Sequence, residues 1–419
     1  MGSATCGVGI VFLQRSFRPI AHHRLPARQV FHVNAVLVVL FSFALLAFHT
    51  GDASLWNIDE ANNAEALKLM ILHHNYVVPL FNGHIRAAKP ILNYWLMDLG
   101  VRVLGLNGWG LRIGSVLMGT FTIAYLIWSL RDIIGARAAL LTGLFTATAL
   151  HSQIIFRAAV PDPLLIFFVT VSLLSWLRGY LEPHYRTRSY LVAYAAMGCG
   201  TLTEGPIAFL LPGLIITVFL LSRKELPHLW RQGRLSVGIP LFLVITLPWY
   251  LAVGLSTHWV WDEQFLEKQN VFRYIHVMQG HNGPLFYYIF STTLGLLPWS
   301  IFLPQTVLWA LKHWRSIYRD RPISAYLWYW AILWIGFFSL GATKLPNYVW
   351  EAYPPLLALI AMRMDLAWNG KEPFSKGAIW FSTGLLAVVG VILVGLGAWL
   401  VPAKIPPLGS VAYLGLPYL

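Results

Sequence analysis

Long apolar stretches are the feature of this sequence that most constrains its fold. A helix that crosses a bilayer takes about 20 mostly apolar residues, and the chain offers roughly eleven such stretches. They lie near residues 31–50, 109–130, 138–156, 162–178, 190–203, 205–222, 236–255, 284–311, 324–343, 347–362 and 377–401. The strands of a membrane barrel alternate in polarity, and residues 35–48 do not. The sequence therefore predicts an all-α integral membrane protein with a bundle of about eleven spanning helices.

The composition agrees with a chain surrounded by lipid. Of the 419 residues, 57% are apolar and 11% are charged, with a mean hydropathy of +0.62, which lies outside the usual range of soluble domains. Cys6 and Cys199 are the only cysteines, so neither a disulfide framework nor a thiolate metal site is expected. We expect no cofactor and predict no bound metal.

Basic residues predict the orientation of the chain. With a cytoplasmic N-terminus, 20 of the 30 Lys and Arg fall on the inner side and 11 of the 17 acidic residues on the outer side, as the positive-inside rule requires. Basic inner loops beside anionic lipid also account for the net charge of +13 without a nucleic-acid partner. We expect a multi-pass membrane protein with a cytoplasmic N-terminus.

One membrane domain is expected, at 31–401. Residues 1–30 carry Arg15, Arg18, Arg24 and Arg28 and predict a cytoplasmic N-terminal segment that is a retained signal anchor. Residues 402–419 predict a short C-terminal segment without a soluble domain. Two long outer loops are expected, at 51–108 and 257–283. The first shows helical periodicity at 59–72, a turn between Pro79 and Gly83, and a second apolar segment at 90–104. We expect both segments to be amphipathic helices at the membrane interface.

Ionisable residues near membrane depth suggest function, because they are costly there. On this topology they gather at the outer ends of the spans. They are Asp59, Glu60, Lys89, Arg157, Asp162, Glu204, Arg273, His281 and Lys344. If the spans pack as one bundle, these groups share one outer surface.

Each of several residues also fits a structural role. Asp59 could cap the helix that follows it, and Lys89 could extend to the interface. Arg157 and Asp162 could form an ion pair, and His281 could be an ordinary loop histidine. Glu204 is different, because an acid in an apolar hairpin needs a partner or stays protonated.

Six motifs in order resemble a known family over roughly residues 35–365. From residue 58 to 96 the chain reads IDEANNAEALKLMILHHNYVVPLFNGHIRAAKPILNYWL. FRAAVPDPLL, TLTEGP and LPWY follow at 156–165, 201–206 and 247–250. The last two motifs are QNVFRYIHVMQGHNGPLFYY at 269–288 and FFSLGATKLPNYVWEAYPPLLAL at 337–359. Together they resemble the bacterial branch of the protein mannosyltransferase group, which includes the aminoarabinose transferase of lipid A, within the GT-C glycosyltransferases.

The resemblance implies a GT-C fold, in which outer-loop helices cover a cavity that is open to the membrane on one side. It implies a polyprenyl-phosphate sugar as donor and an envelope lipid, glycan or protein as acceptor, on the periplasmic side. By similarity, Asp59 is the general base of an inverting displacement, Asp162 is a second carboxylate of the site, and Glu60 is grouped with them as catalytic.

The same resemblance assigns the carrier phosphate to Lys89, Arg273 and Tyr348. Lys344 and His281 would support that pocket, and Arg157 and Glu204 would belong to the substrate-binding set. Fixed cations in a low-dielectric cavity would stabilise a phosphate leaving group, and a carboxylate base would take the proton of the acceptor hydroxyl.

Three departures from the family pattern stand out. Asn62 and Asn63 follow the Asp-Glu pair where the family usually shows Arg and Tyr, Glu204 replaces the Lys of a Lys-Gly-Pro motif, and Ile91 replaces the second Pro of Lys-Pro-Pro. The local charge is lower by three units, which argues against lipid A as acceptor and aminoarabinose as donor.

The main rival is a transporter or flippase of lipid-linked sugars, which would also need an outer cationic pocket. Transporters often contain paired half-repeats and interrupted helices near the bilayer centre, and this sequence shows no such symmetry. An assembly protein would give no reason for Asp59 and Lys89 in one loop.

Overall fold

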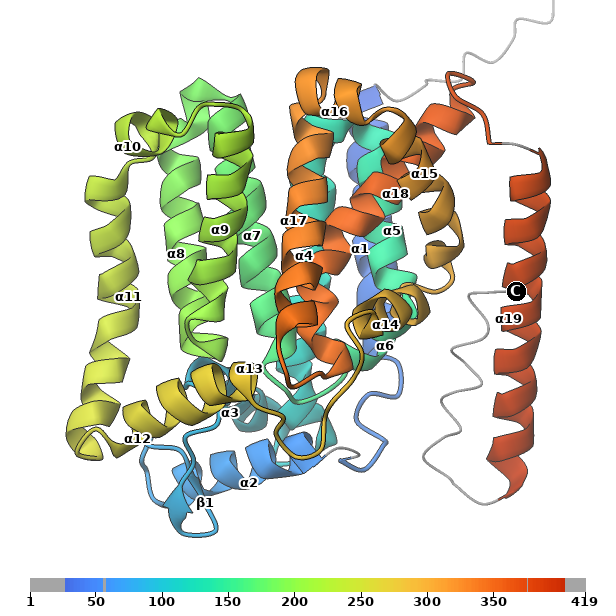
Figure 1. Cartoon of the computed structure of the whole chain (residues 1–419). Helices are drawn as coiled ribbons and strands as arrows, with labels where there is room; N and C mark the ends of the chain where they lie inside the picture. The colour runs from blue at the N-terminus through green and yellow to red at the C-terminus, as the bar shows by residue number, and fades with distance from the viewer. Residues whose placement is uncertain (1–26, 56–57, 375, 404–419) are drawn as a thin grey trace, which may run out of the picture.

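The chain is helical almost throughout in a computed structural model that describes residues 27–55, 58–374 and 376–403. Five described helices are long and apolar enough to cross a membrane. They are α1 (Ala27–Ala47), α4 (Gly108–Ile134), α7 (Asp162–Leu181), α11 (Leu235–Ser256) and α17 (Pro322–Leu340). They stand upright beside one another in Figure 1. The protein is thus an all-helical membrane protein with five candidate spans, or six if one bent pair is counted.

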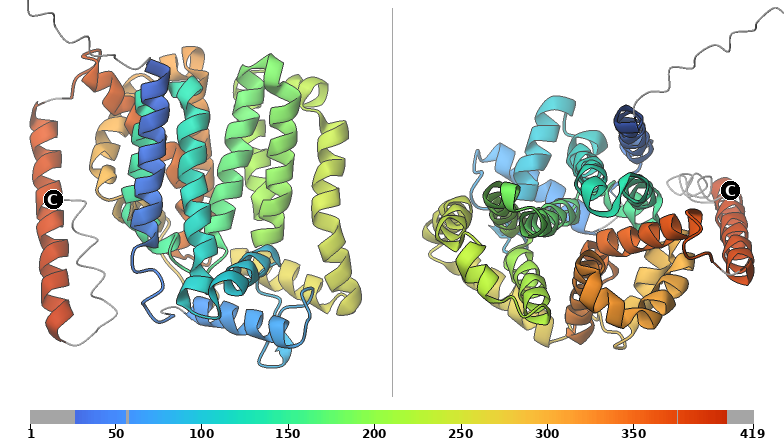
Figure 2. Two further views of the ribbon diagram at one scale, coloured as in Figure 1. Left: turned by 180° about the vertical axis from the view of Figure 1, so that it is seen from behind. Right: turned by 90° about the horizontal axis from the view of Figure 1, so that it is seen from above.

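Further helices complete the bundle. They are α5 (Ala136–Thr148), α6 (Leu150–Ile155), α8 (Arg186–Glu204), α9 (Ile207–Ser222), α18 (Tyr353–Trp368) and α19 (Lys376–Ala403). α19 stands at the edge of the bundle in both views of Figure 2, and it contacts η3 (Trp299–Phe302). The predicted segment 1–30 lies outside the described residues up to residue 26, and the predicted C-terminal segment lies outside them from residue 404.

The span expected at 284–311 is sharply bent in the structure. α14 (Tyr287–Gly295) is followed by η3 and α15 (Leu303–Lys312), and the two halves are bent by 117°. Pro298 stands at the bend, and proline lacks the N–H that a continuous helix needs there. Hydropathy alone shows an apolar run and not its direction.

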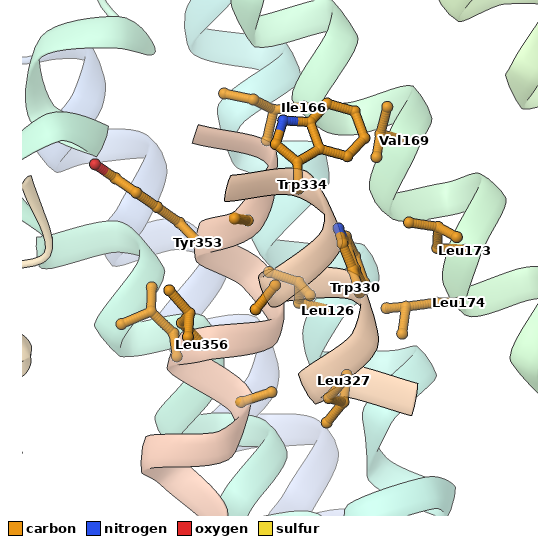
Figure 3. Packing of buried hydrophobic residues seen from close by; sticks show 14 of the residues in the cluster. Leu126, Ile166, Val169, Leu173, Leu174, Leu327, Trp330, Trp334, Tyr353 and Leu356 are labelled. Carbon is orange, nitrogen blue, oxygen red and sulfur yellow. The ribbon is translucent and has the colours of Figure 1, made fainter. Parts of the chain in front are cut away.

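Aromatic side chains of α17 join the two sides of the bundle. Figure 3 shows Trp330 and Trp334 in the space between α17, α7 and α4, close to Val169 and Leu173. Both tryptophans are fully buried. Packing of such large rings gives the bundle a fixed core at this depth, and η4 (Pro346–Ala352) is tied to it because Trp334 Nε1 donates to the Tyr348 carbonyl at 3.0 Å.

The first outer loop folds against one end of the bundle, where Figure 1 shows α2, β1 and α3 together. The expected helices are α2 (Ile58–Leu72) and α3 (Leu92–Leu104). Between them β1 (Leu80–Phe81) and β2 (His84–Ile85) form an antiparallel hairpin in which Leu80 pairs with Ile85. Asn82 and Gly83 form its turn with φ of 50° and 79°, as an Asn-Gly hairpin requires.

The second outer loop is also helical and lies at the same end. α12 (Val260–Glu263), η2 (Gln264–Phe272) and α13 (Arg273–Ile275) follow one another without a break. At the opposite end of Figure 1 lie α10 (Pro227–Gln232) and α16 (Trp314–Asp320). The short η1 (Pro183–Tyr185) connects α7 to α8.

Candidate active site

A cavity of about 490 Å³ lies where both outer loops meet the bundle. Its wall is formed by the segment shortly before α3, the start of α7, the turn between α8 and α9, the segment η2–α13, and η4. Five residues predicted from the sequence line it together: Lys89, Asp162, Glu204, Arg273 and Tyr348. Apolar side chains cover much of the remaining wall, among them Leu165, Leu210, Phe265, Phe337 and Phe338. The cavity thus combines charged groups with a surface that suits a hydrocarbon chain.

Lys89 and Glu204 form a close ion pair in this wall, in which the ammonium donates to the carboxylate. Their side chains are 27% and 11% exposed. Burial lowers the pKa of Lys89, but the carboxylates of Glu204 and Asp162 more than offset this and leave the pKa above its ordinary value. Glu204 has therefore found the partner that an acid in an apolar hairpin needs.

Asp162 is the first residue of α7, and Asn347 Nδ2 donates to its Oδ1 at 2.7 Å. A carboxylate at a helix N-terminus is also favoured by the helix dipole. Asp59 lies near the start of α2 with an exposed side chain. It is not among the residues that line the cavity, but its charge acts on Asp162. The two carboxylates of the predicted site are thus within electrostatic range of each other.

Three buried polar atoms in the cavity wall have no hydrogen-bond partner among the described residues. They are Glu204 Oε1, Arg273 Nε and Tyr348 Oη. Buried polar groups are almost always paired in folded proteins, so three such atoms around one cavity make it a candidate site for a polar ligand. Two of them belong to residues predicted to hold a phosphate.

Glu60 lies outside the lining of this cavity and forms a fully buried ion pair with Arg112. Arg112 Nε and Nη2 donate to the two carboxylate oxygens of Glu60 at 2.9 and 2.8 Å. Glu60 also accepts from the Ala159 N–H at 2.6 Å, and Arg112 donates to the carbonyls of Thr50, Ala53 and Ser54. The pair fixes the chain on either side of Asp59.

Arg157 does not pair with Asp162. Its guanidinium donates to Thr50 Oγ1 at 3.0 Å and to the Phe48 carbonyl, so Arg157 contacts the residues that follow α1 instead of Asp162.

Lys344 and His281 lie beside the cavity and do not line it. Lys344 Nζ donates to the carbonyls of Ser339 and Gly341, both at 2.8 Å, and burial lowers the pKa of Lys344. The backbone N–H of Lys344 donates to the His281 carbonyl at 2.9 Å, while the His281 side chain is exposed. Both residues hold the loop that carries Thr343, which lines the cavity.

Two residues of the cavity wall escaped the sequence interpretation. Glu351, 2% exposed, adds a third carboxyl, and Asn347 holds Asp162 in place. Glu351 could have been found, because it is an acid within the apolar stretch 347–362 and such residues suggest function. No comparable signal marks Asn347.

Asn63, one of the departures from the family pattern, is a buried connector. Its amide oxygen accepts from Arg86 Nη2 at 3.2 Å, and its amide nitrogen donates to the Ala159 carbonyl at 3.1 Å. Throughout 27–55, 58–374 and 376–403, no three His, Cys, Asp or Glu side chains are grouped so that they could hold a metal ion.

Comparison with known proteins places this cavity in context. Residues 88–251 match the family described as dolichyl-phosphate-mannose-protein mannosyltransferase. The undecaprenyl phosphate-alpha-4-amino-4-deoxy-L-arabinose arabinosyl transferase of Edwardsiella ictaluri is 28% identical over 373 residues, which are 87% of this chain and 65% of that protein. A protein of Aquifex aeolicus is 31% identical over 339 residues, which are 78% of this chain and 63% of the other. The chain thus spans just under two thirds of the length of these relatives.

Solved structures share the fold. ArnT from Cupriavidus metallidurans bound to undecaprenyl phosphate superposes with a TM-score of 0.75 at 24% identity, covering 93% of this chain and 69% of that one. The oligosaccharyltransferase of Archaeoglobus fulgidus superposes with a TM-score of 0.58 at 14% identity, covering 94% and 56%. The arrangement of helices and outer loops is therefore that of ArnT.

Proposed function

We propose that this chain, whose residues 88–251 match the dolichyl-phosphate-mannose-protein mannosyltransferase family, is an inverting glycosyltransferase that uses a polyprenyl-phosphate sugar. Its distant homologues include arabinosyl transferases whose donor is an undecaprenyl phosphate sugar. The acceptor would be a hydroxyl of an envelope lipid, glycan or protein on the periplasmic side of a bacterial inner membrane, and the eleven-span topology belongs to the same proposal.

One observation carries the proposal: Lys89, Arg273 and Tyr348 line the same cavity as a large apolar surface. A lipid phosphate needs both, since its phosphate binds cations and hydrogen-bond donors and its hydrocarbon chain packs against apolar side chains. Arg273 Nε and Tyr348 Oη are buried donors without a partner among the described residues. They suit the phosphate oxygens.

In the proposed reaction, the acceptor oxygen attacks the anomeric carbon from the side opposite the phosphate. The bond between that carbon and the phosphate oxygen breaks, and its electron pair stays on the phosphate. Asp59 takes the proton of the acceptor hydroxyl, and Asp162 orients the acceptor or the sugar. We assign Glu60 a positioning role, because its ion pair with Arg112 anchors the first turn of α2, which contains Asp59.

The test separates chemistry from binding in the purified protein. Asp59→Asn should reduce transfer from a labelled polyprenyl-phosphate sugar to membrane extract by about 10²–10⁴-fold, the usual effect of losing a general base, with carrier affinity unchanged. Lys89→Ala and Arg273→Ala should instead weaken binding of polyprenyl phosphate. Arg188→Ala, an exposed cation near the start of α8, is the matched control for charge.

Normal transfer by Asp59→Asn would remove the proposed base. Normal affinity in both cation variants would remove the phosphate pocket. Movement of labelled lipid across reconstituted vesicles, without any transfer, would identify a flippase.

A further inference from the structure

The Lys89–Glu204 pair affects how strongly the cavity can bind an anion, and its role is inferred here on the basis of the proposed function. The cavity wall contains two cations, Lys89 and Arg273, and three carboxyl groups, those of Asp162, Glu204 and Glu351. An ion pair between one of these cations and a carboxylate weakens phosphate binding, because the phosphate must compete with the carboxylate for that cation.

The charge of the ligand changes during the reaction. The donor is a phosphodiester with one negative charge. After transfer, the broken carbon–oxygen bond leaves a phosphate monoester, whose second ionisation lies near pH 6. The released carrier is therefore mainly a dianion at pH 7.5, and strongly cationic pockets hold dianions more tightly than monoanions.

We propose that Glu204 is a built-in counter-charge that matches the pocket to the monoanionic donor and weakens its hold on the dianionic product. Glu204 Oε2 accepts a hydrogen bond from the Lys89 ammonium, so a phosphate that binds Lys89 competes with this carboxylate. Arg273 and Tyr348, whose Nε and Oη have no partner among the described residues, hold the donor phosphate without that competition. Glu204 thereby sets the preference between donor and product.

The experiment compares two probes at pH 7.5, a polyprenyl monophosphate and its methyl phosphodiester, on the purified full chain. In Glu204→Gln, Lys89 loses its closest counter-charge, and Asp162 remains near enough to interact with it. We expect the monophosphate to bind about tenfold more tightly, equal to about 1.4 kcal/mol, and the diester to gain clearly less. Turnover should become more strongly inhibited by added monophosphate.

Two further variants make the test specific. Glu182→Gln removes a carboxylate that faces Arg178 at 3.6 Å away from the cavity, and it should change neither affinity. In Lys89→Gln/Glu204→Gln the gain should largely disappear, because it depends on Lys89. A merely structural role of Glu204 would lower both affinities and would not change their ratio.

Equal gains for both probes, no gain, or a gain that persists without Lys89 would overturn the inference while leaving the proposed function intact. Failure of the wild-type protein to bind either probe would overturn the proposed function itself. The rate at which an acylating reagent modifies Lys89, followed by mass spectrometry, checks the ion pair independently of any carrier: it should rise in Glu204→Gln, and an unchanged rate would contradict the pair.

Discussion

Glu60 and Arg112 have side chains that are 0% and 1% exposed, and their ion pair has no access to water. Glu60→Gln keeps the shape of the side chain but leaves the guanidinium buried without a charged partner. Breaking a buried pair from one side costs about 3–5 kcal/mol. We therefore expect a large fall in the thermal unfolding temperature of the detergent-purified protein.

Glu65→Gln is the matched control, because Glu65 faces Lys68 at 3.3 Å on the partly exposed side of the same helix. Exposed pairs contribute about 0–1 kcal/mol, so its unfolding temperature should hardly move. Equal unfolding temperatures for the two variants would contradict the anchoring role of Glu60.

At this scale the sequence predicted which residues share a cavity better than it predicted the partners of each side chain. Lys89, Asp162, Glu204, Arg273 and Tyr348 reach one cavity as expected, because each stands at the end of a helix or in a loop at the same end of the bundle. Glu60 and Asp59 are neighbours in sequence, yet the helix turns them to different surroundings. Long-range partners such as Arg112 for Glu60 and Asn347 for Asp162 leave no local pattern.

The turn between α8 and α9 shows how one element shapes the cavity. Gly205 ends α8 with φ 86° and ψ −151°, a conformation open almost only to glycine. A Cβ there would lie 2.5 Å from Phe265 Cζ, and Phe265 belongs to the cavity wall. Gly205→Ala should destabilise the protein by about 1–3 kcal/mol through backbone strain alone, and displacement of Phe265 should add to this and weaken carrier binding.

Gly213→Ala in α9 is the control, because a Cβ at Gly213 meets nothing within 4 Å. Alanine favours a helix over glycine by roughly 0.5–1 kcal/mol, so this variant should unfold at the same or a slightly higher temperature. An equal effect of the two substitutions, measured by thermal unfolding and carrier titration, would show that the turn tolerates a side chain.

Elements with a local cause were predictable. The stretch between Pro79 and Gly83 predicted the turn that joins β1 to β2, and helical periodicity predicted α2. The bend of 117° between α14 and α15 was not predicted, since the apolar residues continue through it. The continuous helix from α12 to α13 was also not predicted. Its residues face the cavity on one side and are exposed on the other, so their mean hydropathy is intermediate and resembles that of a loop.

At the scale of the whole molecule, the orientation in the membrane decides which side of the membrane the cavity faces. The cavity, both long loops and the hairpin lie at one end (Figure 1), while η1 and α10 connect helices at the other. The positive-inside rule predicts that the cavity end faces the periplasm. Burial of long helices fixes how they pack, but packing is the same in either orientation, so only the loop charges predict the side.

Single cysteines distinguish the two orientations in intact cells. In a Cys6→Ser/Cys199→Ala background, His281→Cys introduces a thiol at an exposed position of the cavity end, and His184→Cys introduces one at an exposed position in η1. A membrane-impermeant maleimide should label His281→Cys directly and should label His184→Cys only after the membrane is permeabilised. The reverse pattern would place the cavity in the cytoplasm, where the acceptor could not be a periplasmic envelope component. Labelling of both thiols in intact cells would mean that the two loops lie on the same side, which the upright helices between them could not allow.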